Sequence, residues 1–156
     1  MPHELILDRL LDAPADVLFD LWTNPARMGE WFCPKPWKVT RAELDVRPGG
    51  IGNITMEGPN GEVMENPGQY LEVIPGRKIV FSDAFTGDWN PKDGAPFMVA
   101  TITFTPEGGK TRYRAVVRHW DEASRKKHED MGFHTGWGIV ADQLEALAKS
   151  IAENAP

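Results

Sequence analysis

Two polar side chains in the sequence are placed to do acid–base chemistry in an apolar setting. In the strand-like run at 78–85, Asp83 falls on the same face as phenylalanines, and in the run at 111–120, His119 shares a face with apolar side chains. An inward charge is costly unless it is paired, so the two could form a carboxylate–imidazole pair, or each could make a structural hydrogen bond. His134 stands one turn from an apolar helical stripe, either at a cavity mouth or on the surface.

Aromatic and methionine side chains are the second group of candidates. The sequence has six tryptophans in 156 residues, and pockets for small apolar or aromatic ligands are lined by such side chains with few polar groups. Ordinary core packing is the alternative, because large aromatics supply much of the buried area of any core. The candidates for a cavity or its mouth are Trp31, Trp37, Met56, Tyr70, Phe81, Asp83, Phe85, Trp89, Met98, His119, His134 and Trp137.

The sequence contains no motif for a nucleophile, a metal or a phosphate group. The single cysteine, Cys33, lacks a Cys/His partner motif, and His128 and His134 are six residues apart, which places them on different helical faces. The glycine run at 49–52 lacks the strand-to-helix context of a phosphate-binding loop. We therefore expect no dedicated catalytic residues, no metal site and no cofactor.

Turn residues divide the first two thirds of the chain into short elements. Residues 4–12 predict a first strand, and helical spacing predicts two short helices at 14–22 and 25–31. Proline- and glycine-rich turns then separate six strand-like runs, and short turns favour antiparallel neighbours. These runs are 37–46, 50–58, 62–74, 78–85, 97–105 and 111–120.

The last third of the chain is predicted to be helical. Asp121 is a suitable N-cap for a short charged helix at 122–130. Apolar side chains at steps of three and four then predict a helix over 131–153, about 30 Å long. Glycines at its start would either leave cavity volume or allow close backbone packing; they are Gly132, Gly136 and Gly138.

This order of elements predicts an α+β fold with one curved, seven-stranded antiparallel sheet wrapped around the long C-terminal helix. A cavity can remain on the concave side of such a sheet. The longest connection, 86–96, carries Trp89, and long loops over cavities are often functional. We expect Trp89 to act as a lid near Trp31, Phe32 and Trp37, or else to anchor its loop on the outer sheet or on a second subunit.

Composition is that of an ordinary soluble domain, with 41% apolar and 26% charged residues. The length predicts a single domain over residues 1–156. No apolar window is long enough for a membrane span, and no signal peptide can be read at the N-terminus. The net charge of −6 argues against a phosphate-tracking groove, so we expect no nucleic-acid partner and no membrane partner. A single cysteine makes the cytoplasm the expected compartment.

Short motifs follow one another in a characteristic order over residues 4–150. They are Pro14–Phe19, Trp22 with Pro25 and Trp31-Phe32, Asp45–Gly50, Gly68–Tyr70 with Pro75, Gly108-Gly109 before Thr111-Arg112, Met131–Phe133 and Gly136-Trp137. In this order and spacing the chain resembles the START-like, birch-pollen-allergen-like superfamily, and within it the bacterial homologues of the heat-shock-protein-90 ATPase activator. The resemblance implies the helix-grip fold. It leaves the function open among lipid carriers, polyketide cyclases and chaperone regulators.

Our leading hypothesis from sequence is a small-molecule-binding protein for a hydrophobic or aromatic ligand, non-enzymatic or weakly enzymatic, as monomer or homodimer. The first alternative is a protein-interaction module that regulates a chaperone ATPase. Its partner would dock on a basic patch of Arg112, Arg114, Arg118, Arg125, Lys126 and Lys127. The second alternative is a cyclase- or hydratase-like enzyme with Asp83, His119 or His134 as general acid or base.

Overall fold

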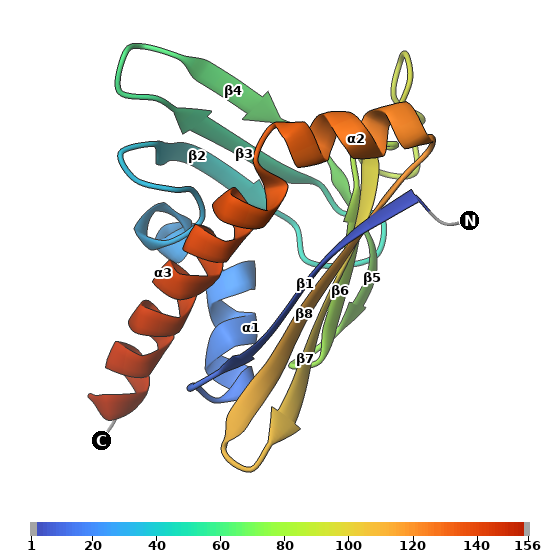
Figure 1. The fold of residues 1–156 in the computed structure, drawn as a ribbon. Helices are drawn as coiled ribbons and strands as arrows, with labels where there is room; N and C mark the ends of the chain where they lie inside the picture. The colour runs from blue at the N-terminus through green and yellow to red at the C-terminus, as the bar shows by residue number, and fades with distance from the viewer. Residues whose placement is uncertain (1–2, 155–156) are drawn as a thin grey trace.

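The computed structural model describes residues 3–154, and Figure 1 shows their fold. An antiparallel arrangement of strands is combined with helices at both ends of the chain, which confirms the α+β class. The elements are β1 (His3–Leu11), α1 (Ala15–Thr23), the 3-10 helix η1 (Pro25–Glu30), β2 (Lys38–Leu44), β3 (Gly52–Glu57), β4 (Val63–Asn66), β5 (Gln69–Ile74), β6 (Lys78–Ser82), β7 (Met98–Glu107), β8 (Lys110–His119), α2 (Glu122–Asp130) and α3 (Phe133–Glu153).

Five strands form the main sheet in the order β1-β8-β7-β6-β5, and every neighbouring pair is antiparallel. Strand β8, which lies between β1 and β7, places His119 opposite His3 of β1 and opposite Met98 of β7. Alternate side chains of β7 and β8 are buried, as the strand parity predicted; Ile102 and Val117 are examples. This sheet supplies one wall of the core.

The expectation of one seven-stranded sheet is wrong, because the strands divide into a five-stranded and a three-stranded sheet. The predicted strand at 62–74 is broken into β4 and β5 by Pro67 and Gly68. Proline has no N–H for a ladder hydrogen bond, and glycine favours a bend. Among residues 3–154, the second sheet, β2-β3-β4, is linked to the first by the isolated bridge between Ile51 and Gln69, by adjoining backbone hydrogen bonds, and by the Gly68 N–H, which donates to Asn53 Oδ1.

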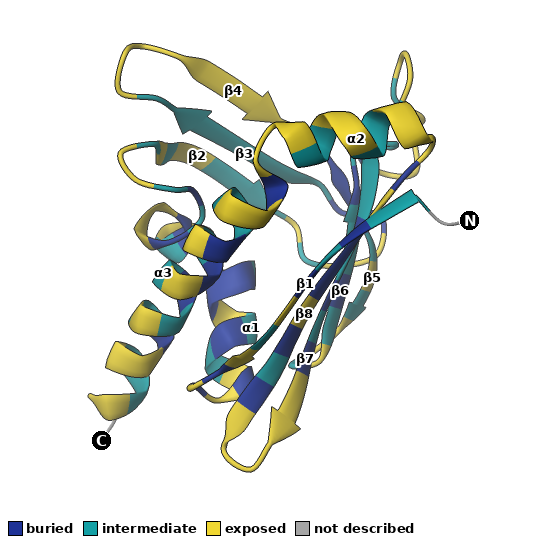
Figure 2. Cartoon of the chain, viewed as in Figure 1, coloured by how far each residue is buried: buried dark blue, intermediate teal, exposed yellow. Residues whose placement is uncertain are grey.

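The helices cover the main sheet on one side. Figure 1 shows α1 and α3 lying close together on that side. The three-stranded sheet and α2 lie near the N-terminal end of α3. Figure 2 shows buried residues where α1 and α3 face the sheet, whereas β4 is exposed along its length. Leu18 and Leu144 are fully buried at this contact. No helix among the described residues is both long and apolar enough to cross a membrane.

The long helix starts two residues later than its apolar stripe predicts. Gly132 precedes α3 with φ of 93°, a left-handed conformation that favours glycine. Asp121 caps α2 as predicted, since its carboxylate accepts a hydrogen bond of 2.7 Å from the backbone N–H of Ser124. The chain therefore turns twice between β8 and α3, and α2 lies across the end of the main sheet.

Candidate functional site

A pocket of about 530 Å³ lies between the two sheets and the helices. Its wall is drawn from the α1–η1 segment, from both sheets, and from the junction of α2 with α3. Most of the lining side chains are apolar or aromatic. They include Trp22, Phe32, Leu44, Ile54, Tyr70, Phe81, Phe97, Tyr113, Phe133, Trp137 and Val140.

Methionines are concentrated in this wall. All five methionines of the described residues line the pocket, although they come from four separate segments of the chain: Met28 in η1, Met56 and Met64 in the β3–β4 hairpin, Met98 in β7, and Met131 between α2 and α3. Met28 is buried at the base, whereas Met64 and Met131 are 41% and 63% exposed and so mark where the pocket opens. Methionine is flexible and polarisable, so a wall of this kind can adapt to differently shaped apolar molecules.

Aromatic contacts hold the deeper part of the wall in place. The indole of Trp22 packs against Phe32 and Phe81 with ring centroids 5.8 and 5.9 Å apart. Its Nε1–H donates a hydrogen bond of 3.2 Å to the hydroxyl of Tyr113. Burial raises the pKa of the Tyr70 and Tyr113 phenols, which keeps both uncharged. The deep wall is therefore closely packed and uncharged.

Two histidines meet at the α2 end of the pocket. His119 Nε2 and His128 Nδ1 are 2.9 Å apart, and His119 Nδ1 is 3.0 Å from the carbonyl oxygen of His3. Only His128 lines the pocket, and its ring centroid is 5.1 Å from Phe97 and 5.2 Å from Phe133. Burial and the neighbouring His119 lower the pKa of His128 from 6.5 to about 4, so its ring is neutral at physiological pH.

Of the two alternatives that the sequence leaves open for Asp83, the structure does not show the carboxylate–imidazole pair with His119. The Asp83 carboxylate accepts the backbone N–H groups of Phe97 and Met98 at 2.9 and 3.0 Å, and Lys92 Nζ lies 3.3 Å away. Asp83 lies beyond the end of β6, so its carboxylate ties the long loop to the start of β7. The structural alternative therefore describes Asp83, although its side chain still borders the pocket.

Six of the twelve candidate residues line the pocket: Met56, Tyr70, Phe81, Asp83, Met98 and Trp137. The other six lie elsewhere. Trp31 is fully buried in the core, and Trp37 packs on Gly58 in the β3–β4 turn. His119 contacts His128 but does not itself line the pocket. His134 is largely exposed, and its Nε2 lies 3.6 Å from a Glu129 carboxylate oxygen. These four are corrections to the predicted cavity wall.

Phe85 and Trp89 are the remaining two, and they pack on each other at 5.5 Å, away from Trp31 and Trp37. The backbone N–H of Trp89 donates to the side-chain oxygen of fully buried Gln69 at 2.9 Å, and its ring lies against Gly49. Placing Trp89 as a lid was therefore wrong, and the alternative of an anchor on the sheet describes its contacts. The loop at 86–96 is held down by hydrogen bonds to β5 and the Gly49 turn.

Sequence reasoning missed His128, Met28 and Met64 as pocket residues. His128 sits in a charged helical segment, and only the turn after β8 brings it back over the strand end. The methionines carried a signal, because Met64 belongs to the same hairpin as the predicted Met56. Gly136 also lines the pocket, and a Cβ built on it would meet no atom within 4 Å, so this glycine does leave cavity volume.

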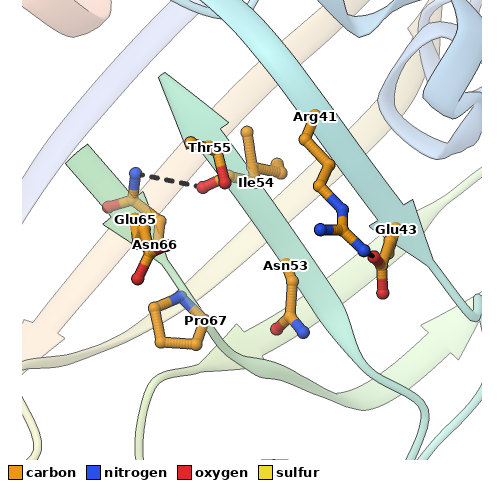
Figure 3. Close-up of a pocket in the computed structure, with 8 residues that line it drawn as sticks. All are labelled: Arg41, Glu43, Asn53, Ile54, Thr55, Glu65, Asn66 and Pro67. Carbon is orange, nitrogen blue, oxygen red and sulfur yellow. Dashed lines mark hydrogen bonds and ion pairs between the residues drawn. The ribbon is translucent and has the colours of Figure 1, made fainter. Parts of the chain in front are cut away.

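A second, smaller pocket of about 310 Å³ lies over the three-stranded sheet and is lined by charged and polar side chains (Figure 3). Figure 3 shows Arg41 turned toward Glu43, with which it forms an ion pair, and the Asn66 amide bonded to the backbone of Ile54. Arg41 is largely exposed. The side chains of Arg41, Glu43, Asn53 and Asn66 in this pocket are already engaged by protein groups, so it is the weaker candidate for ligand binding.

The predicted basic patch is largely neutralised by neighbouring acids. Arg112 pairs with Asp8 and Glu107 at 3.4 and 3.0 Å, and Arg118 pairs with Glu4 at 3.3 Å. Ion pairs also form at Arg114, Arg125 and Lys126. Among the described residues, Lys127 is the one member of the patch for which no ion pair forms, so little uncompensated positive charge remains to attract an acidic partner.

Comparison with known proteins identifies the family. The model of the activator of Hsp90 ATPase homolog 1-like protein family matches residues 12–149. The chain belongs to this family. The resemblance read from the sequence motifs is thereby confirmed. No curated protein matches the sequence.

Solved structures agree with the activator-homologue assignment. A Nitrosomonas europaea protein is 36% identical, with a TM-score of 0.91 and 96% of each chain covered. A Mycobacterium smegmatis protein is 26% identical, with a TM-score of 0.78 over 92% of this chain and 89% of the other. An Aeromonas hydrophila protein described as AHSA1-like shares 13% identity and a TM-score of 0.72, covering 96% and 94%, and so shows the fold alone.

Proposed function

We propose that this activator-homologue chain binds one small, apolar or aromatic molecule in the pocket between its two sheets and α3, without transforming it. The observation that carries the proposal is the convergence of five methionines and a set of aromatic side chains on a single pocket. A volume of about 530 Å³ falls within the range of small-molecule sites.

The chemistry of the wall supports binding over catalysis. Asp83 is engaged by two backbone N–H groups and Lys92, and the Trp22–Tyr113 hydrogen bond occupies another polar pair. A general acid or base must reach the reacting group with a free proton or lone pair. Asp83 is committed to the loop, which leaves it poorly placed to act as a base. His128 also lines the pocket, but its pKa of about 4 makes its ring a weak base at neutral pH.

The cysteine supports the cytoplasm as the proposed compartment. Cys33 is free and buried, and burial raises the pKa of its thiol. A protonated, buried thiol is unreactive and needs no partner, which suits a reducing environment.

The test is a fluorescence titration with N-phenyl-1-naphthylamine, a probe that brightens in apolar surroundings. Gly136→Leu places a side chain in open pocket space, and replacing a helical glycine also stabilises the helix by about 1 kcal/mol. We expect the wild type to bind the probe and Gly136→Leu to bind it at least about tenfold more weakly. Thr135→Leu, an exposed neighbour outside the pocket wall, is the matched control.

Loss of binding in a variant that is more stable than the wild type would assign the effect to the filled pocket. No probe binding by the folded wild-type protein would overturn the proposal. Equal binding by wild type, Gly136→Leu and Thr135→Leu would place the probe on another surface and would overturn it as well.

A further inference from the structure

The contact between His119 and His128 defines which nitrogen atoms of the two imidazole rings carry protons. The Nδ1 of His119 lies 3.0 Å from the carbonyl oxygen of His3. A carbonyl only accepts hydrogen bonds, so Nδ1 of His119 carries a proton, and in the neutral ring Nε2 is then an unprotonated acceptor. The contact of 2.9 Å with His128 therefore makes His128 Nδ1 the donor when both rings are neutral.

The same reasoning defines the other nitrogen of His128. A neutral imidazole with its proton on Nδ1 has a bare lone pair on Nε2. Among residues 3–154, no side-chain or backbone group makes a hydrogen bond to this atom. Because Nδ1 is already used, Nε2 is the polar atom that the His128 ring can offer to the pocket it lines.

We propose that the pocket ligand is an aromatic or alicyclic molecule with a hydroxyl group, whose O–H donates to His128 Nε2 while its ring packs among Phe97, Phe133 and Trp137. This deepens the proposed function and rests on it. Such a ligand would be held in the way that a buried phenol is held: its hydroxyl would make one polar contact, and its ring would lie in otherwise apolar surroundings. The aromatic rings lie 5.1, 5.2 and 6.4 Å from the imidazole, close enough to flank a bound ring.

Charged groups around the pair leave the hydroxyl class as the best match. Lys92, on the same pocket wall, could attract a carboxylate, but it is already paired with Asp83 at 3.3 Å. An anion would also face the lone pair of His128 and the Asp83 carboxylate. A neutral donor meets no such repulsion. The other charged or titratable groups near the pair are His3, Asp121, Glu122, Glu129 and His134.

The test compares three probes of similar size: 2-naphthol, 2-methoxynaphthalene and 2-naphthoate. Each is titrated at about pH 7.5 against bound N-phenyl-1-naphthylamine. One hydrogen bond of ordinary strength predicts that 2-naphthol binds about three- to tenfold tighter than its methyl ether. In His128→Phe, which keeps the ring packing, this preference should vanish when both affinities are compared within that variant. His134→Gln, an exposed histidine outside the wall, should keep the preference.

Nitrogen-15 NMR of the histidine rings gives an independent readout that does not depend on a variant. We expect the Nε2 atoms of His119 and His128 to be unprotonated, with 2-naphthol shifting only the His128 Nε2 signal strongly. A proton on His128 Nε2, equal affinity for naphthol and its methyl ether, or tightest binding of 2-naphthoate would overturn the inference. Each of these results would leave the proposed function standing, provided that the wild-type protein binds N-phenyl-1-naphthylamine. If the wild type does not bind that probe, the proposed function itself is refuted.

Discussion

His128 links the pocket to the acid stability of the fold. Its pKa is about 4 in the folded chain and 6.5 ordinarily, so the unfolded chain binds a proton between those values that the folded chain does not. The contribution of His128 to the free energy of unfolding is therefore fully present above pH 6.5 and is lost as the pH falls toward 4. The ring is only half-buried, so solvent reduces the effect.

We therefore predict that, from about pH 7.5 to about pH 5, the wild type loses about 1 kcal/mol more unfolding free energy than His128→Phe. Urea unfolding at the two pH values measures this difference, and carboxylates that titrate alike in both proteins cancel. A wild-type loss equal to or smaller than that of the variant would show that His128 is not held neutral by the fold.

Asp83 shows that predicting which face of a strand a side chain occupies does not predict its hydrogen-bond partner. Strand parity placed it toward the interior, and its side chain does border the pocket. However, β6 ends at Ser82, and the returning loop brings the N–H groups of Phe97 and Met98 within hydrogen-bonding distance. Unsatisfied backbone donors nearby attract a carboxylate at least as well as a histidine does. The sequence carries no signal for which loop backbone will return to that point.

At the scale of elements, two glycines near the start of α3 have opposite roles. Gly132 precedes the helix with φ of 93°, whereas Gly136 lies within the helix, and a Cβ at either position would meet nothing within 4 Å. An alanine at 132 is strained by its backbone conformation, which costs about 1–2 kcal/mol. An alanine at 136 only gains helix propensity, about 1 kcal/mol.

We predict that Gly132→Ala lowers and Gly136→Ala raises the free energy of unfolding by about 1 kcal/mol each. Chemical denaturation of the two variants beside the wild type measures both. A shift in the same direction for both variants would contradict this account of the α2–α3 junction. Gly138 differs from both, because it allows the Arg9 side chain to lie close to the helix: a Cβ at this position would lie 2.8 Å from Arg9 Nη2.

The turn at 87–90 carries the backbone strain of the long loop. Asp88 and Trp89 have φ of 51° and 63°, and the N–H of Asn90 donates to the carbonyl of Gly87 at 3.1 Å, as in a type I′ turn. A glycine is favoured at the second central position of such a turn. A glycine at position 89 would relieve the backbone strain, which raises the free energy of unfolding by about 1 kcal/mol, and would remove the ring contact with Phe85, which lowers it by about 1 kcal/mol.

Trp89→Gly is therefore predicted to change stability by less than about 1 kcal/mol and to leave binding and release rates of N-phenyl-1-naphthylamine unchanged. Asp88→Gly, which relieves strain without removing the ring, is the matched control and should be the more stable of the two. Stopped-flow fluorescence measures the rates. Faster release from Trp89→Gly alone would restore the lid interpretation.

At the scale of the whole molecule, local patterns predicted the order of elements, and long-range packing decided the pocket. The apolar stripe of α3 and the alternation in β7 and β8 were readable because each buries one face. The strand-like run at 62–74 predicts one strand although it contains Pro67 and Gly68, and the structure divides it at these two residues. His128 could not be placed from sequence, because its contact with His119 depends on how α2 folds back across the sheet end.

The proposed function rests on five methionines, from η1, the β3–β4 hairpin, β7 and the α2–α3 junction, that line one pocket. Carbon-13 labelling of the methionine methyl groups tests it most directly, by NMR titration with 2-naphthol or N-phenyl-1-naphthylamine. We predict that the methyl signals of Met28, Met56, Met64, Met98 and Met131 shift together with one dissociation constant, and that Gly136→Leu abolishes these shifts. Shifts confined to the exposed Met64 and Met131, or absent from all five, would contradict the claim.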